Sequence, residues 1–193
     1  MALDNDAATS TPMSTAAGTI PLAHVVQGNG PLLVLIHGIT ENRHSFDPLL
    51  PMLQSRYRVL AVDLRGHGDS PPAAEYPLDA MAADVAAEVA QVVDGLGSES
   101  GEPGQAPLVV GHSLGGIVAA AYAVRFPVRG VVNIDQSLDL AAMQEQVQAV
   151  EGLLRSDAFP AVITGMFAQM TGQLPPDEQQ RVGARVTEFD PAV

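Results

Sequence analysis

The chain has 193 residues, of which 47% are hydrophobic and 16% charged, and it contains no cysteine. This composition is typical of one globular domain with a substantial core, and the lack of cysteine excludes a disulfide framework, a thiolate metal site and a cysteine nucleophile. With 22 acidic and 9 basic residues the formal net charge is −13, which argues against nucleic acid or an anionic membrane surface as a partner.

Residues 1–18 are small and polar, and we predict that they form a flexible N-terminal tail. They lack the apolar segment of a signal peptide. No uninterrupted apolar run elsewhere has the length of a transmembrane span. We therefore expect a cytoplasmic protein.

Between residues 19 and 136, short apolar runs alternate with patterns of helical spacing. The apolar runs predict extended segments or strands at residues 20–27, 31–37, 58–62 and 129–134. Helical spacing covers residues 45–54, where two prolines are expected to make the start irregular, and residues 78–96. The uninterrupted apolar run at 31–37 is typical of a strand that is covered on both faces of a parallel sheet. This alternation predicts βαβ units and an α/β fold.

After residue 136 the pattern contains helices only. Apolar residues recur at helical spacing over 143–154 and 159–170, and a third, weaker helix is predicted over 176–189. Apolar faces of this kind usually pack into a core. The alternative is a lid that lays its apolar face over a pocket.

Residues 107–126 combine a β-branched run, the sequence Gly-His-Ser-Leu-Gly and an alanine-rich helical pattern. A G-x-S-x-G motif between a strand and a helix is typical of a serine held at a sharp turn, where Gly111 and Gly115 avoid a collision. The N-terminal amides of the helix would face an anion formed at Ser113. The alternative is a glycine-rich turn that only packs well.

Several polar residues follow the predicted strands directly. His37 with Gly38, Asp63, Ser113 and Asp135 all lie where a strand is expected to end. In open parallel sheets, ligands bind beyond the carboxyl ends of the strands. The sequence therefore predicts that these residues converge on one site.

Three motifs occur together in a specific order: His37-Gly38, the Asp-Leu-Arg-Gly-His-Gly-Asp-Ser loop at 63–70, and Gly-His-Ser-Leu-Gly-Gly at 111–116. In this order and spacing the chain resembles the α/β-hydrolase fold superfamily, in the branch with a helical cap inserted after the sixth strand. The resemblance covers about residues 20–190. It implies a hydrolase core at 19–136, with a mostly parallel sheet flanked by helices, and a helical cap or lid at 137–193.

The resemblance also implies roles for individual residues. Ser113 resembles the nucleophile, and the backbone N–H groups of Leu114 and Ile39 resemble the two donors of the oxyanion hole. His37 and Gly38 resemble the loop that shapes the substrate-binding site. The family implies a small-molecule substrate and no cofactor, and the sequence has no metal-ligand spacing such as H-E-x-x-H.

The chain departs from the family in one respect. The family's order is nucleophile, acid, then histidine, yet no histidine follows Ser113. We expect the last strands, the histidine and the usual acid to lie beyond residue 193, and weak activity of this chain alone, because a serine without a base is a weak nucleophile. Asp135 is a tentative acid, and the alternative is a carboxylate that holds a loop amide or caps a helix.

The other histidines have structural interpretations. We expect the side chain of His112 to point away from the catalytic face, and we expect His37 and His67 to shape their turns. A substitute base from His37 or His67 is the less favoured alternative.

The sequence thus predicts a serine-dependent hydrolase that acts on a small ester or related acyl substrate through an acyl-serine intermediate. A non-catalytic ligand-binding or interaction protein on the same fold is an alternative from another class. A cofactor-free haloperoxidase-like or carbon–carbon bond hydrolase is a second alternative. The sequence leaves the substrate and the oligomeric state open.

Overall fold

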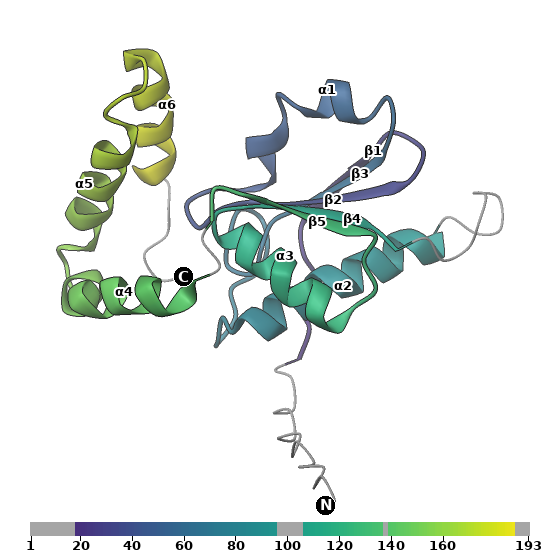
Figure 1. The fold of residues 1–193 in the computed structure, drawn as a ribbon, viewed down its shortest axis with the longest axis horizontal. Helices are drawn as coiled ribbons and strands as arrows, with labels where there is room; N and C mark the ends of the chain where they lie inside the picture. The colour runs from purple at the N-terminus through teal and green to yellow at the C-terminus, as the bar shows by residue number, and fades with distance from the viewer. Residues whose placement is uncertain (1–17, 96–105, 137–138, 188–193) are drawn as a thin grey trace, which may run out of the picture.

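The computed structural model describes residues 18–95, 106–136 and 139–187, so the tail predicted at 1–18 lies almost wholly outside the described residues (Figure 1). In these ranges one sheet has the strand order β1-β3-β2-β4-β5. Its strands are β1 (His24–Gln27), β2 (Leu32–Ile36), β3 (Arg58–Val62), β4 (Leu108–His112) and β5 (Gly130–Ile134). The predicted α/β fold with a mostly parallel sheet is confirmed.

The strands of this sheet run parallel except at one edge. β1 pairs antiparallel with β3, whereas β2, β3, β4 and β5 pair in parallel. In the register, Ile36 lies opposite Val62 on one side and Gly111 on the other, and His112 lies opposite Ile134. The carboxyl ends of the parallel strands therefore lie side by side at one edge of the sheet. The polar residues that follow these strands are thus close together, as the sequence predicts.

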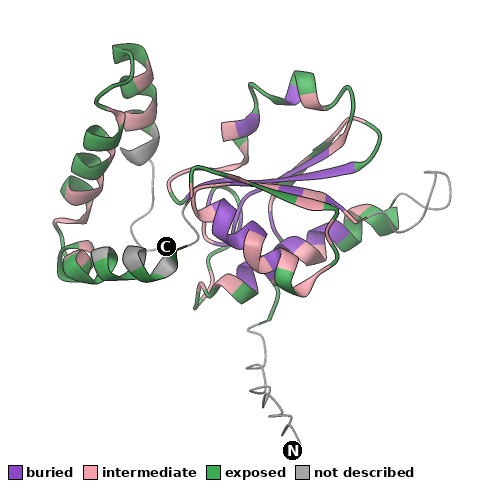
Figure 2. Ribbon diagram, in the orientation of Figure 1, coloured by how far each residue is buried: buried purple, intermediate pink, exposed green. Residues whose placement is uncertain are grey.

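Helices cover both faces of the sheet, which explains why β2 is buried along its whole length (Figures 1 and 2). Val34 and Ile36 pack in a cluster with apolar residues of α2 (Leu78–Gly95) and α3 (Leu114–Arg125). Leu33 and Leu35 pack in a second cluster, with Phe46 and other residues on the opposite face. Successive residues of a strand point to opposite faces, so an unbroken apolar run is what a two-sided core requires.

One predicted helix is interrupted. Instead of a helix over 45–54, the structure has a 3-10 helix, η1 (Arg43–Phe46), and a single turn, α1 (Leu50–Leu53). The Asn42 side chain caps η1 by accepting the N–H of His44 at 3.0 Å. Pro48 lacks a donor N–H, and Pro51 stands at the start of α1, where a helix tolerates proline. The segment is helical, as the spacing of its apolar residues predicts, but its two prolines divide it into η1 and α1.

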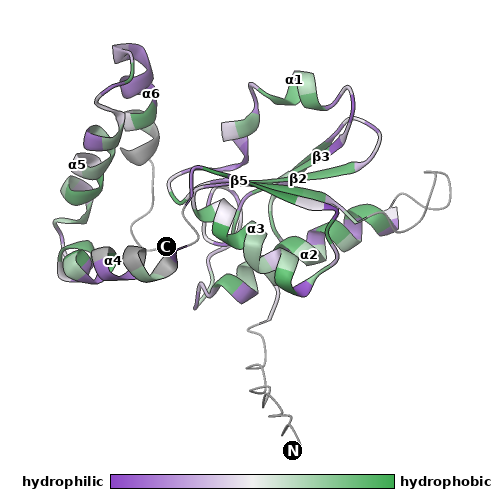
Figure 3. Ribbon diagram, in the orientation of Figure 1, coloured by the Kyte–Doolittle hydropathy of each residue, from purple (hydrophilic) through white to green (hydrophobic). Residues whose placement is uncertain are grey.

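The last described segment consists of three helices, as predicted. These are α4 (Leu140–Leu154), α5 (Phe159–Thr171) and α6 (Pro176–Thr187). They lie beyond the carboxyl ends of the parallel strands, beside the core (Figure 1). α5 has no buried residue, and Figure 3 shows apolar residues along it. None of the helices in the described ranges is long and apolar enough to cross a membrane.

Candidate active site

Ser113 occupies a strained turn between β4 and α3. Its backbone has φ 51° and ψ −120°, a conformation that residues other than glycine rarely adopt. Its N–H donates to Ile134 O at 3.0 Å, and its carbonyl accepts the N–H of Gly116 at 2.8 Å. The strand, the turn and the helix therefore have the arrangement that a G-x-S-x-G motif predicts.

Gly111 and Gly115 permit this turn because the backbone passes very close to them. A Cβ atom on Gly111 would lie 1.9 Å from Gly115 O. A Cβ atom on Gly115 would lie 2.1 Å from Ile36 O, at the end of β2. Helix α3 therefore begins in direct contact with β2, and only glycine fits at both positions.

The loop after β2 packs against the turn. A Cβ atom on Gly38 would lie 3.2 Å from Ser113 Cβ, so the backbone of this loop adjoins the serine. Within the described ranges no acceptor is hydrogen-bonded to the N–H of Ile39 or of Leu114. The N–H groups expected to form the oxyanion hole thus belong to the two segments that meet at Ser113, and they have no other acceptor there.

His37 is fully buried beneath this loop. Its Nε2 accepts the N–H of Leu64 at 3.0 Å, so its Nδ1 carries the proton and donates to Gly38 O at 2.7 Å. Burial is the main reason that the pKa of His37 is lowered from 6.5 to about 4. His37 is therefore neutral near pH 7, and both of its ring nitrogens hold loop backbone.

His67 joins the loop after β3 to the loop after β2. Its ring nitrogens lie 2.9 Å from Arg65 O and 2.8 Å from Ile39 O. Both nitrogens contact backbone carbonyls, so this ring, like that of His37, is engaged in shaping the loops. This arrangement favours the structural interpretation of both histidines over a role as substitute base.

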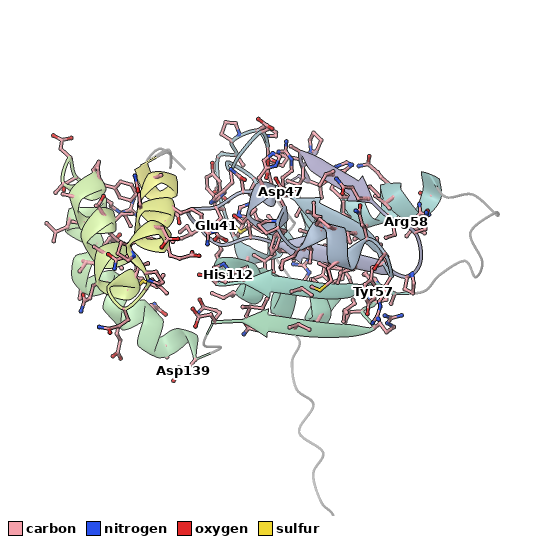
Figure 4. The ribbon with its side chains drawn as sticks, turned by 90° about the horizontal axis from the view of Figure 1, so that it is seen from above. Glu41, Asp47, Tyr57, Arg58, His112 and Asp139 are labelled. Atoms are coloured by element: carbon pink, nitrogen blue, oxygen red, sulfur yellow. The ribbon has the colours of Figure 1, made fainter. Side chains whose placement is uncertain are left out.

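The structure places a pair at the site that sequence reasoning missed. Glu41 Oε2 lies 2.9 Å from His112 Nδ1 and also accepts the N–H of Gly38 at 2.9 Å. Figure 4 shows Glu41 and His112 together on the side of the core that faces helices α4–α6. The sequence predicts a structural role for His112 and a side chain that points away from the catalytic face, whereas the structure places the His112 ring against the Gly38 loop. No sequence pattern indicates Glu41, which is 71 residues away along the chain.

Asp135 follows β5 directly beside Ser113. The register pairs His112 with Ile134, so Ser113 and Asp135 are the next residues of adjacent strands. Asp135 has φ 61°, is exposed, and its carboxylate has no hydrogen bond to any described residue. Its proximity is consistent with the tentative role of acid, which stays a prediction.

The Ser113 hydroxyl has no hydrogen-bonded base among the described residues. All five histidines are described, and their ring contacts are to other groups, such as Glu88 for His24 and Asp47 for His44. The predicted site residues are thus brought together at one end of the sheet, without a histidine at the nucleophile.

The loop at 63–70 is held by a buried carboxylate. Asp63, fully buried, accepts the backbone N–H of Arg43 at 2.6 Å and that of Asp69 at 2.9 Å, and pairs with the Arg43 guanidinium. The guanidinium also binds Asp69 at 2.6 Å. Asp63 therefore connects two loops beneath the site. It follows a strand, as the sequence predicts, and its contacts are structural.

A mostly parallel sheet with helices on both faces and a serine at a strand-to-helix turn is the arrangement of an α/β hydrolase. A family model described as the alpha/beta hydrolase family matches residues 33–192. The chain therefore belongs to the alpha/beta hydrolase family.

Known proteins resemble the chain over much of its length. It is 33% identical over 159 residues to a 2-(acetamidomethylene)succinate hydrolase of Mesorhizobium japonicum, with 78% of this chain and 54% of that protein covered. It is 38% identical over 128 residues to a pimeloyl-[acyl-carrier protein] methyl ester esterase of Neisseria meningitidis, with 66% of this chain and 43% of that protein covered. The chain thus spans about half the length of these relatives.

A solved structure has the same fold. A thermophilic esterase from Thermogutta terrifontis superimposes with a TM-score of 0.71 at 24% identity, covering 95% of this chain and 65% of that structure. At this identity the likeness shows the fold alone.

Proposed function

We propose that this chain carries the nucleophile and the oxyanion hole of a serine hydrolase for a small ester or related acyl substrate. One observation carries the proposal: Ser113 stands at a strained strand-to-helix turn with the backbone of Gly38 packed against it. The relatives named as an ester esterase and as a succinate hydrolase support an acyl substrate.

In the proposed reaction, Ser113 Oγ attacks the acyl carbon of the substrate. A C–Oγ bond forms while the carbonyl electron pair moves to oxygen, and a base accepts the hydroxyl proton. The tetrahedral intermediate then collapses, the bond to the leaving group breaks, and that group takes up a proton. Water hydrolyses the acyl-serine in the same two stages and releases the acid.

The oxyanion is stabilised in this proposal by the N–H groups of Ile39 and Leu114. Neither group has another acceptor in the described ranges, so both are open to the developing oxyanion. Each such donor contributes about 3 kcal/mol to transition-state stabilisation. The first-turn amides of α3 add the positive end of the helix dipole.

Helices α4–α6 serve as a lid in this proposal. They lie beyond the carboxyl ends of the strands, where Ser113 also lies, and their exposed apolar side chains suit the acyl part of a substrate (Figures 1 and 3). These exposed side chains include Val147, Leu153, Met166 and Met170.

The test is labelling of the chain with a fluorophosphonate probe, followed by intact-mass measurement. Because no described base is bonded to Ser113, we expect slow labelling: one adduct on the wild type after long exposure, none on Ser113→Ala, and an unchanged adduct on Ser55→Ala, which removes an exposed hydroxyl bonded to Met52 O. Labelling that survives in Ser113→Ala would overturn the proposal. A folded wild-type chain that does not label would overturn it as well.

A second candidate is a non-catalytic ligand-binding protein on the same fold. It is favoured by one observation: among the described residues, no base is hydrogen-bonded to the Ser113 hydroxyl. In that case the folded chain binds a short-chain carboxylate or ester reversibly without labelling. Carbon–carbon bond hydrolysis and cofactor-free haloperoxidase chemistry would use the same serine, and a substrate panel on a labelled chain separates them from ester hydrolysis.

A further inference from the structure

One carboxylate oxygen joins the two segments that meet at the candidate active site. Glu41 Oε2 accepts the N–H of Gly38 and lies 2.9 Å from His112 Nδ1. Gly38 immediately precedes Ile39, and His112 immediately precedes Ser113. The side chain of Glu41 therefore bridges the loop that supplies one proposed oxyanion donor and the turn that supplies the nucleophile.

The pair is only partly open to solvent. The side chains of Glu41 and His112 are 19% and 35% exposed, whereas the pair of His44 and Asp47 on η1 has exposures of 60% and 54%. Ion pairs in contact with bulk water contribute little, and partial burial strengthens the attraction between the two groups. The pair of His44 and Asp47 is thus a more exposed histidine–carboxylate pair in the same chain, and it serves as the control.

The charges of the pair stabilise each other. The hydrogen bond that His112 donates to Glu41 raises the pKa of His112, and the burial of His112 opposes this, while the charge of Asp135 adds a smaller raising effect. Burial by itself raises the pKa of Glu41, but the hydrogen bonds from His112 and Gly38 outweigh it and leave that pKa lowered, and the positive charge of His112 adds to this effect. The ion pair therefore persists between the lowered pKa of Glu41 and the raised pKa of His112.

We propose that Glu41 and His112 are positioning residues that hold the Gly38–Ile39 backbone against the Ser113 turn. The pair fixes the spacing between the Ile39 and Leu114 N–H groups, and the alignment loosens when His112 loses its proton. This inference rests on the proposed function for its catalytic consequence, but the coupling between Gly38 and His112 is a property of the folded chain.

The coupling is tested by NMR titration of the full chain. We expect the amide resonance of Gly38 to shift with the same midpoint as the His112 ring, above the 6.5 of an ordinary imidazole. In Glu41→Gln the His112 midpoint should fall to 6.5 or below, and Asp47→Asn should leave it unchanged. A Gly38 amide that does not follow His112 in the wild type, or a His112 midpoint that Glu41→Gln leaves in place, would overturn the proposal.

The catalytic consequence is tested by the rate of phosphonylation of Ser113. We expect Glu41→Gln to slow labelling by about tenfold to a hundredfold at pH 7, since a small misplacement of reacting groups has effects of this size. Asp47→Asn should label at the wild-type rate. Wild-type labelling in a Glu41→Gln chain that has lost the NMR coupling would overturn the positioning role.

A conservative variant separates positioning from simple folding. His112→Gln retains an N–H donor for Glu41 but does not titrate. We expect it to label faster than Glu41→Gln but more slowly than the wild type, because it keeps the hydrogen bond and loses the charge, while the Gly38 amide loses its titration near neutral pH. A wild-type chain that does not label defeats the proposed function, and the two NMR measurements then decide the positioning pair by themselves.

Discussion

The sheet core and the segment of helices α4–α6 hold their side chains in different ways. In the core, charged groups are buried and paired, as for Arg65 and Asp84, which are 1% and 0% exposed. In the helical segment the pair of Arg155 and Glu151 lies in solvent, and α5 has no buried residue. The candidate site therefore lies on a well-packed core, whereas the neighbouring helices α4–α6 have exposed apolar side chains.

The largest effect is expected from breaking the buried ion pair. Asp84 binds the Arg65 guanidinium at 2.7 and 2.9 Å and accepts the N–H of Ile20 at 2.9 Å. Asp84→Asn should lower the free energy of unfolding by about 3–5 kcal/mol, because it leaves a buried cation without its partner. Urea denaturation followed by circular dichroism measures this loss. Asp94→Asn, at an exposed position of the same helix, should have little effect, and equal losses in the two variants would contradict the assignment.

The next prediction compares truncations in the two regions. Leu60 in β3 is fully buried, whereas Met166 in α5 is 46% exposed. Leu60→Ala should cost about 2–5 kcal/mol of unfolding free energy, since it leaves a cavity. Met166→Ala should cost less than about 0.5 kcal/mol, as is usual for surface positions. A loss at Met166 as large as that at Leu60 would mean that the helices pack against the core more tightly than the contacts indicate.

The buried His37 should make the core sensitive to acid. Its pKa of about 4 in the folded chain lies below the 6.5 of the unfolded chain, so the unfolded state binds the proton first as the pH falls. The contribution of neutral His37 to the free energy of unfolding is fully present above pH 6.5. It is lost as the pH falls from 6.5 to 4, by about 3 kcal/mol in total. Chemical denaturation at several pH values measures it. The slope over this range should decrease in His37→Gln and persist in His44→Gln, and a His37→Gln chain with the wild-type slope would refute it.

The smallest effect is expected on the surface of the helical segment. Arg155 and Glu151 form an exposed i,i+4 pair on α4, with an N–O distance of 2.8 Å. Arg155→Gln should change the free energy of unfolding by no more than about 0.5 kcal/mol, and added salt should remove the difference. Thermal denaturation at low and high salt checks this. A larger, salt-resistant loss would indicate that the pair is shielded from water.

Much of the fold could be predicted because its signals are local. The unbroken apolar run of β2, the glycines around Ser113 and the helical spacing of α2 each describe a few neighbouring residues, and each prediction is confirmed in the structure. The helix predicted over 45–54, with an irregular start at its two prolines, is divided in the structure into η1 and α1. The roles of Ser113 as nucleophile and of Asp135 as acid stay predictions.

The strands, the sharp turn at Ser113 and the family of the chain could be predicted from the amino-acid sequence, because apolar periodicity and short motifs involve only neighbouring residues. Only the tertiary structure decided that Glu41 reaches His112, that both nitrogens of His37 hold loop backbone, and that Asp84 is buried against Arg65. The physical reason is that the pKa of a group depends on its burial and on the charges near it, and these come from residues far apart in the sequence. Glu41 and His112, for example, meet only because the folded sheet places the ends of its strands side by side.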